Sequence, residues 1–190
     1  MTVEDTDALI VVDVQNDFCP GGALPVTDGH LVARAINRIM PKFHRVVLSR
    51  DWHPRDHCSF SETPEYRDGS WPEHCVADSP GAEFIGDLML PMDALIVSKG
   101  MDHEREAYSA FDGEPPLADR LHAWGIHRVF IAGLATDYCV RATALDAIRF
   151  GFQACLLQDG CRGVARETAE AALEELRAAG VRMTHSGDFE

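Results

Sequence analysis

Four groups of polar residues could do chemistry, and each follows a short apolar run. They are Asp13, the group Asp51, Trp52 and His53, the pair Ser98 and Lys99, and the segment from Gly133 to Cys139. If the apolar runs are neighbouring strands, these groups bring an acid, an acid with an imidazole, a base and a thiol to one site. These groups could carry out acyl transfer with a cysteine nucleophile, and they could also bind a metal ion.

Cys139 is the candidate nucleophile. Thr136 or Asp137 is a suitable N-cap and places the thiol in the first turn of a helix, where free N–H groups and the helix dipole favour the thiolate. Gly133 permits close backbone approach, and the N–H groups of Ala135 and Cys139 could form an oxyanion hole. The alternative is that Cys139 is a small buried hydrophobic residue.

Asp13 and Lys99 are the candidate partners of this thiol. Asp13 follows the apolar run at 9–12, where desolvation raises the pKa of its carboxyl group unless a cation compensates. It could take the proton of Cys139 and later give it to a leaving group, although it could instead cap a loop. Lys99 is the natural cation, and as one of only two lysines in an arginine-rich chain it fits a role that needs a compact ammonium.

Asp51 and His53 indicate a partial metal site. In an extended chain their side chains point to the same side, whereas Pro54 disfavours a helix that would pair His53 with His57. His74 or His57 could complete a site for Zn²⁺, Mn²⁺ or Fe²⁺. The alternative is that these histidines are solvated or hydrogen-bonded in the core.

The elements that must position these residues form an alternating pattern. Short runs rich in Val and Ile predict strands at 8–12, 45–48, 94–97, 128–132, 154–157 and 181–184. Amphipathic stretches predict helices at 28–41, 117–124, 136–150 and 166–179. Strands without polar alternation are typical of parallel sheets buried on both faces. We therefore expect an α/β fold with three layers, a six-stranded parallel sheet between helices, which is Rossmann-like.

The segment from Asp51 to Asp93 breaks this pattern. It holds five prolines and shows neither helical nor strand periodicity, which is usual for a functional or disordered connection. Its five Trp, Tyr and Phe residues argue against disorder. We expect a single domain over residues 1–190, with a long metal-binding insert at about 51–93.

Composition excludes several classes of partner. The chain has 190 residues, with 31 Asp and Glu against 17 Lys and Arg, so the net charge of −14 disfavours nucleic acid and anionic membranes. No apolar run approaches a membrane span, and the acidic start differs from a secretory signal. The six cysteines form no C-x-x-C pair, and a chain of this size needs no disulfides, so we expect reduced thiols in a cytoplasmic protein.

Six segments together resemble a known family. They are VVDVQNDF at 11–18, DWHP at 51–54, WPEHC at 71–75, SKG at 98–100, YSAF at 108–111 and GLATDYCV at 133–140. In this order they are similar to the signatures of nicotinamidases (pyrazinamidases), which are isochorismatase-like cysteine hydrolases. The resemblance extends over nearly the whole chain.

The resemblance implies a role for each site residue. It implies a catalytic triad of Asp13, Lys99 and Cys139, an oxyanion hole of the Ala135 and Cys139 N–H groups, and a cis peptide between Leu134 and Ala135. It implies one divalent metal ion, zinc in preference to iron or manganese, on Asp51, His53 and His74, with His57 as an optional fourth ligand. A ring pocket would be lined by Phe18, Leu24, Trp71, Tyr108 and Leu134.

The implied activity is hydrolysis of nicotinamide to nicotinate and ammonia through a thioester, in NAD salvage, with pyrazinamide as a further substrate. The main alternative is a hydrolase of the same fold that acts on isochorismate or on another small amide. A receiver-like module that binds Mg²⁺ and accepts phosphate, and a metallohydrolase in which Cys139 is incidental, are more distant alternatives. A monomer and a homo-oligomer are both compatible with the sequence.

Overall fold

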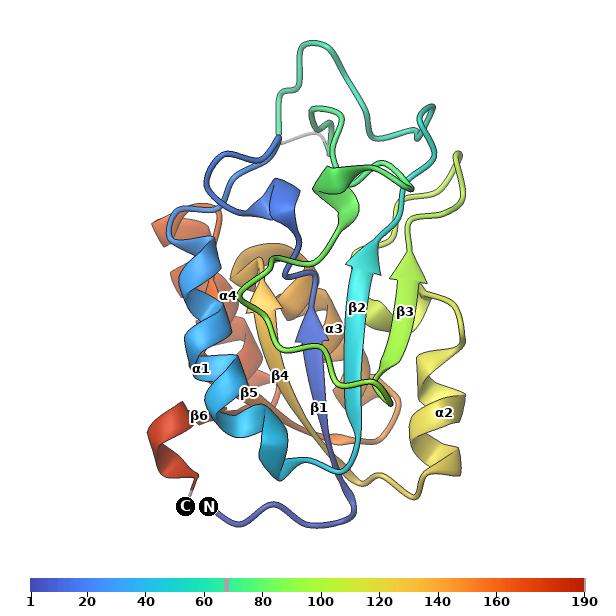
Figure 1. The fold of residues 1–190 in the computed structure, drawn as a ribbon. Helices are drawn as coiled ribbons and strands as arrows, with labels where there is room; N and C mark the ends of the chain where they lie inside the picture. Colours follow the sequence, from blue (N-terminus) through green and yellow to red (C-terminus); the bar gives the residue numbers. More distant parts are fainter. Residues whose placement is uncertain (67–68, 190) are drawn as a thin grey trace.

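A six-stranded parallel sheet is the centre of the computed structural model, which describes residues 1–66 and 69–189 (Figure 1). The strands are β1 (Asp7–Val12), β2 (Val46–Asp51), β3 (Leu95–Lys99), β4 (Arg128–Leu134), β5 (Gln153–Arg162) and β6 (Arg182–Thr184). Their order is β3-β2-β1-β4-β5-β6, and every neighbouring pair is parallel. All six residues of β1 are buried, as a strand covered on both faces requires. The α/β class and the six-stranded parallel sheet predicted from the sequence are confirmed.

Helices cover both faces of the sheet. They are α1 (Val32–Ile39), α2 (Leu117–Ala123), α3 (Arg141–Arg149) and α4 (Arg166–Ala178). Helix α1 lies in front of β4 and β5 in Figure 1, whereas α3 and α4 pack against each other behind the sheet. The helix predicted at 28–41 is shorter, because 3₁₀ turns at Gly29–Leu31 and Met40–Lys42 flank α1. Pro41 in the second turn has no N–H with which to continue the α-helical bonding.

The segment between β2 and β3 covers the part of the front face that α1 leaves open (Figure 1). Ile85 and Leu88 of this segment are buried in the core. The Gln15 side chain ties the start of this segment to a point further along it by donating to the carbonyls of Asp51, at 2.8 Å, and Ala82, at 2.9 Å. Hydrogen bonds rather than regular periodicity therefore fix this connection.

The crevice of the sheet lies between β1 and β4. The chain leaves β1 for one side of the sheet through α1, and it leaves β4 for the other side through α3, so a ligand site is expected at their carboxyl ends. Gly133 in β4, with φ +126°, permits the close approach of β4 to β1, because a Cβ there would lie 2.0 Å from the Val12 carbonyl oxygen. Asp13 comes directly after β1, and Cys139 lies in the turn after β4.

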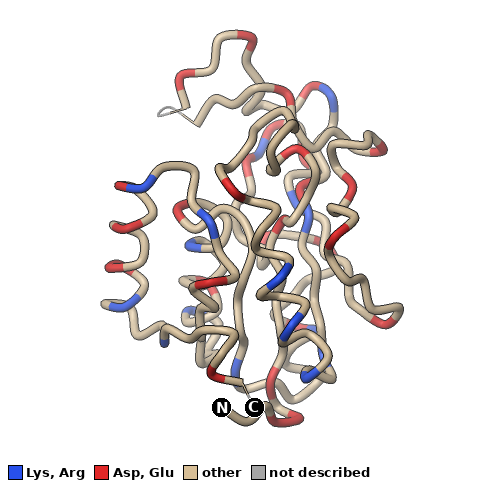
Figure 2. Tube along the Cα trace, turned by 60° about the vertical axis from the view of Figure 1, so that its left-hand side comes forward, with Lys and Arg blue, Asp and Glu red and all other residues tan. Residues whose placement is uncertain are grey.

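Acidic residues occur along the whole chain trace, with basic residues between them (Figure 2). Within the described part of the chain, no helix is both long enough and apolar enough to cross a membrane.

Candidate active site

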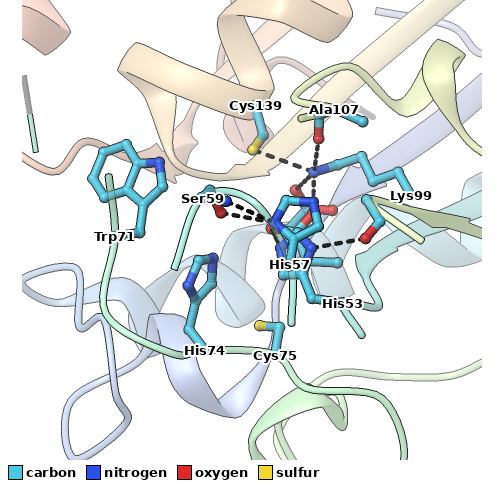
Figure 3. Close-up of polar contacts among 12 residues, drawn as sticks. His53, His57, Ser59, Trp71, His74, Cys75, Lys99, Ala107 and Cys139 are labelled. Atoms are coloured by element: carbon cyan, nitrogen blue, oxygen red, sulfur yellow. Dashed lines mark hydrogen bonds and ion pairs between the residues drawn. The ribbon is translucent and has the colours of Figure 1, made fainter. Parts of the chain in front are cut away.

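Lys99 contacts both Asp13 and Cys139, and Figure 3 shows its ammonium directed at the Cys139 sulfur. Its Nζ lies 2.9 Å from Asp13 Oδ2 and 3.4 Å from Cys139 Sγ, and it also donates to the Ala107 carbonyl at 3.2 Å. The same ammonium forms an ion pair with Asp51. All of these side chains are buried. The fold thus brings together the three residues predicted to form the triad.

Asp13 has one carboxylate oxygen available for proton exchange. Ser49 Oγ donates to its Oδ1 at 2.7 Å, whereas its Oδ2 faces the Lys99 ammonium at 2.9 Å. A carboxylate oxygen of Asp13 and the Cys139 sulfur lie within 4.8 Å of each other. Asp13 also has φ +50°, a conformation that is uncommon outside glycine and is found most often at functional sites.

Burial and charge set the resting protonation of these groups. Burial raises the pKa of Asp13, the Lys99 ammonium partly offsets this, and Asp51 raises the pKa again. Burial would lower the pKa of Lys99, but Asp13 and Asp51 raise it well above its usual range. Burial raises the pKa of the Cys139 thiol, Lys99 opposes this, and the two carboxylates add to it. The resting site therefore favours a thiol, which differs from the thiolate expected from a helix start.

The turn that carries Cys139 is a π-turn at Thr136–Val140, which leads into α3. Its N-cap is Ala135, whose carbonyl accepts from the Tyr138 and Val140 N–H groups at 3.0 and 3.1 Å. The expectation that Thr136 or Asp137 caps this turn is wrong, because neither side chain makes the capping hydrogen bond.

The Asp137 carboxylate instead holds the start of α4. It accepts hydrogen bonds from the Val164 N–H at 2.9 Å, the Ala165 N–H at 3.2 Å and the Thr168 hydroxyl. These donors converge on one buried carboxylate, which outweighs a single local cap. Asp137 therefore joins the nucleophile turn to α4.

The Leu134–Ala135 peptide is cis, as the resemblance implied. Among the described residues, no backbone acceptor is found for the Ala135 N–H. The Cys139 N–H belongs to the first turn of the helical segment, where N–H groups commonly lack intrahelical acceptors. These two amides are the available donors for an oxyanion near the sulfur.

Asp51, His53 and His74 form a cluster that suits a metal ion. Their ligand atoms lie within 4.8 Å of one another, and all three residues are buried. His53 Nδ1 is 2.9 Å from the Gly100 carbonyl oxygen, and His74 Nδ1 is 2.7 Å from the Pro72 carbonyl oxygen. A carbonyl only accepts, so each Nδ1 carries a proton, and Nε2 is the ring nitrogen that each histidine can offer to a metal ion.

Electrostatics keeps this cluster ready for a cation. Burial alone would raise the pKa of Asp51, but Lys99, His53 and His74 together hold it below its usual range. The carboxylate is therefore ionised. Gly100, with φ +63°, leaves room for the His53 ring, because a Cβ there would lie 2.3 Å from His53 Cε1.

His57 lies beside this cluster but faces other partners. Its Nε2 donates to the Arg105 carbonyl at 3.2 Å, and its Nδ1 accepts from Ser59 Oγ at 2.8 Å. Its ring lies against that of His53, with 4.2 Å between centroids. Both ring nitrogens are engaged by protein groups, which favours a supporting role for His57, and its place as an optional fourth ligand stays a prediction.

A pocket of about 450 Å³ opens above the thiol and the metal cluster. Of the residues predicted to line it, Phe18, Leu24, Trp71 and Tyr108 do so. Trp71 and Tyr138 meet edge to face at 5.0 Å, and Trp71 Nε1 donates to the Tyr108 hydroxyl at 3.1 Å. These contacts fix the orientation of the aromatic side chains that line the pocket, so the pocket suits a flat ring.

Leu134 does not line the pocket. Its side chain is buried and packs beside Gly29, because the last residue of β4 points into the core. Four further residues line the pocket and were not predicted from the sequence: Val26, Glu106, Tyr138 and Val164. Tyr138 could have been found from its position next to Cys139. Val164 follows the true end of β5, which polar residues after 157 conceal in the sequence.

Comparisons with known proteins agree with this geometry. A family profile described as the isochorismatase domain matches residues 7–188. The nicotinamidase/pyrazinamidase of Mycobacterium tuberculosis is 45% identical over 188 residues, which cover 94% of this chain and 98% of that protein.

Solved structures give the same grouping. The pyrazinamidase of Pyrococcus horikoshii, in complex with zinc, is 46% identical with a TM-score of 0.85, over 95% of this chain and 99% of that one. PnC1 from L. infantum, in complex with nicotinate, is 38% identical with a TM-score of 0.91, over 100% of this chain and 98% of that one. The chain therefore belongs to the isochorismatase family, in its nicotinamidase branch.

Proposed function

We propose that this protein is a cysteine amidohydrolase that converts nicotinamide to nicotinate and ammonia. The observation that carries the proposal is the buried contact of Lys99 with both Asp13 and Cys139 beneath a pocket with aromatic walls. The relatives that are named nicotinamidases, and the structural neighbour that holds nicotinate, support the choice of substrate. Pyrazinamide, whose ring has the same shape, is expected to be hydrolysed as well.

The first step is proton transfer from the Cys139 thiol to Asp13, while the sulfur attacks the carboxamide carbon. Because the proton moves between two buried groups, the net charge of the site stays the same, and Lys99 stays next to both. The developing oxyanion would accept hydrogen bonds from the Ala135 and Cys139 N–H groups.

In the second step Asp13 returns the proton to the amide nitrogen, the C–N bond breaks, and ammonia leaves a thioester on Cys139. Water then gives one proton to Asp13 and adds to the thioester carbonyl. When the C–S bond breaks, Cys139 recovers its proton and nicotinate is released. Asp13 thus acts as base and acid in each half of the cycle, with the Lys99 ammonium beside its Oδ2 throughout.

Asp51, His53 and His74 are proposed to hold one divalent cation, with zinc preferred to iron or manganese. The donor set of one carboxylate and two imidazoles fits zinc, and the contacts of both Nδ1 atoms with carbonyls, which leave Nε2 to face the cluster, support that assignment. When bound, such an ion would supply a Lewis-acidic point for a ring nitrogen or for a water that contacts it. The zinc in the Pyrococcus horikoshii structure is consistent with this choice.

The six cysteines are all free thiols in the structure, which supports a reducing compartment. We accordingly place the protein in the cytoplasm, where nicotinate would re-enter NAD salvage. A single domain over residues 1–190 remains our prediction.

The deciding experiment measures ammonia and nicotinate released from nicotinamide by metal-loaded protein. Cys58 is exposed and would react with alkylating reagents, so the Cys58→Ser variant is the matched background. We expect Cys58→Ser to keep full activity and to lose it on treatment with iodoacetamide, and Cys139→Ala to show no turnover. Mass spectrometry after acid quench should detect a nicotinoyl adduct on Cys139. Turnover by Cys139→Ala would overturn the covalent route, and absence of nicotinate release by the wild type would overturn the substrate.

A further inference from the structure

A groove between α1 and the end of β5 is basic, although the chain as a whole is acidic. Its volume is about 720 Å³, and its lining includes Arg34, Arg38, Arg162 and one acid, Asp159. Three positive charges and one negative charge leave the groove with a charge of +2, in a chain with a net charge of −14. Such a local reversal of sign attracts anions.

Arg34 and Arg38 lie at positions where their charges do not stabilise α1. They are four residues apart on one exposed side of the helix, and like charges at that spacing destabilise a helix. Arg34 also lies in the first turn, where the helix dipole disfavours a cation and where α1 has no acidic residue. An anion in the groove would relieve both unfavourable interactions.

No carboxylate of the described residues pairs with these arginines, in contrast to arginines elsewhere. Arg141 pairs with Glu175 at 2.6 Å, and Arg166 pairs with Glu170 at 2.8 Å. No ion pair of Arg34 or Arg38 is found in residues 1–66 and 69–189. Their guanidinium groups are therefore available for a ligand.

Arg162 closes the groove at the end of β5. Its Nη1 donates to the carbonyls of Cys161, at 2.7 Å, and Asp159, at 3.4 Å, which hold the guanidinium in place. The Asp159 carboxylate is occupied by Ser186, which donates from its N–H at 2.9 Å and from its hydroxyl at 2.6 Å. Asp159 thus keeps Ser186 at the edge of the groove and does not neutralise Arg162.

We propose that this groove binds a phosphate group, either free or carried by a small metabolite. Guanidinium groups form paired hydrogen bonds to phosphate oxygens, and three of them around one groove suit a doubly charged oxyanion. The site is separate from the pocket above Cys139. Leu31 lines the groove and Val26 lines the active-site pocket, so a short segment of the chain connects the two.

The test compares two double variants with equal net charge. Arg34→Gln with Arg38→Gln removes two charges from the groove, whereas Arg120→Gln with Arg177→Gln removes two exposed arginines from α2 and α4. Binding of inorganic phosphate and of a phosphate monoester is measured by calorimetric titration at low and high salt. Circular dichroism confirms that both variants are folded.

We expect the wild type and the α2 and α4 variant to bind alike, and the groove variant to bind at least tenfold more weakly. Affinity should fall as salt rises, because the interaction is between exposed charges. Tighter binding of the monoester than of free phosphate identifies a metabolite as the ligand, and the reverse identifies the free ion. Equal affinity in both variants, or no binding by the wild type at phosphate up to about 10 mM, overturns the proposal.

Discussion

Replacement of Lys99 by Met tests whether the ammonium stabilises two buried carboxylates. Met preserves much of the length of the side chain but removes its charge and its hydrogen bonds. In the native protein Lys99 Nζ lies 2.9 Å from Asp13 Oδ2, pairs with Asp51 and donates to Ala107. The substitution leaves Asp13 and Asp51 as buried acids without their common cation.

The expected cost follows from burial. Removing one partner of a fully buried ion pair typically costs ~3–5 kcal/mol, because the remaining charge is left without compensation. For a chain of 190 residues this corresponds to a fall in Tm of roughly 6–20 °C. Adding Asp13→Asn to Lys99→Met removes one of the two stranded charges, so the double variant should lose less stability than the sum of the single variants, by ~1–3 kcal/mol.

The assay is equilibrium urea unfolding of the metal-free protein, repeated across pH. In Lys99→Met the pKa of Asp13, already raised by burial, should rise further without the ammonium. The native state would then hold a proton that the unfolded chain releases near pH 4, so stability should fall as pH rises above about 4. A loss below about 1 kcal/mol, or strict additivity in the double variant, would refute this account of Lys99.

Three further predictions concern the surroundings of the site. Gly100→Ala should weaken metal binding by about 10- to 100-fold, since its Cβ would displace His53; an unchanged affinity in a chelator competition would contradict this. His57→Phe should keep bound metal and His53→Ala should lose it, as measured by elemental analysis; equal loss in both would restore His57 as a ligand. Asp137→Ala should destabilise the protein by about 1–2 kcal/mol and speed hydrogen exchange at the start of α4; unchanged exchange there would count against the cap.

The strands could be predicted because their apolar runs are short, continuous and bounded by polar residues. β5 was the exception, since it continues to Arg162 through Gln158 and Asp159, which end the apolar run at 157. The register between β4 and β5 also shifts between Ile131 and Gly133. Periodicity cannot detect such an irregularity, and for this reason Val164 was missed as a lining residue.

Local sequence predicted the site residues better than it predicted their partners. Asp13, Lys99 and Cys139 were identifiable because each lies at or shortly after the end of a strand, and the carboxyl ends of parallel strands meet. The partner of Asp137 was not identifiable, because the donors that it binds come 27 to 31 residues later in the chain. The same limit applies to His57, whose hydrogen bond to the Arg105 carbonyl spans 48 residues.

The position of Cys139 at a helix start predicts a thiolate, whereas its burial favours a thiol. A helix start favours a thiolate by an amount that is modest and confined to the first turn. In this site burial raises the pKa of the Cys139 thiol, and the nearby carboxylate of Asp13 adds to this effect, while Lys99 opposes it. The thiol can react only if its proton stays within the site, and Asp13, whose pKa is raised, is the group placed to hold it. Asp13→Asn should therefore abolish turnover even though Cys139 and the helix start are unchanged.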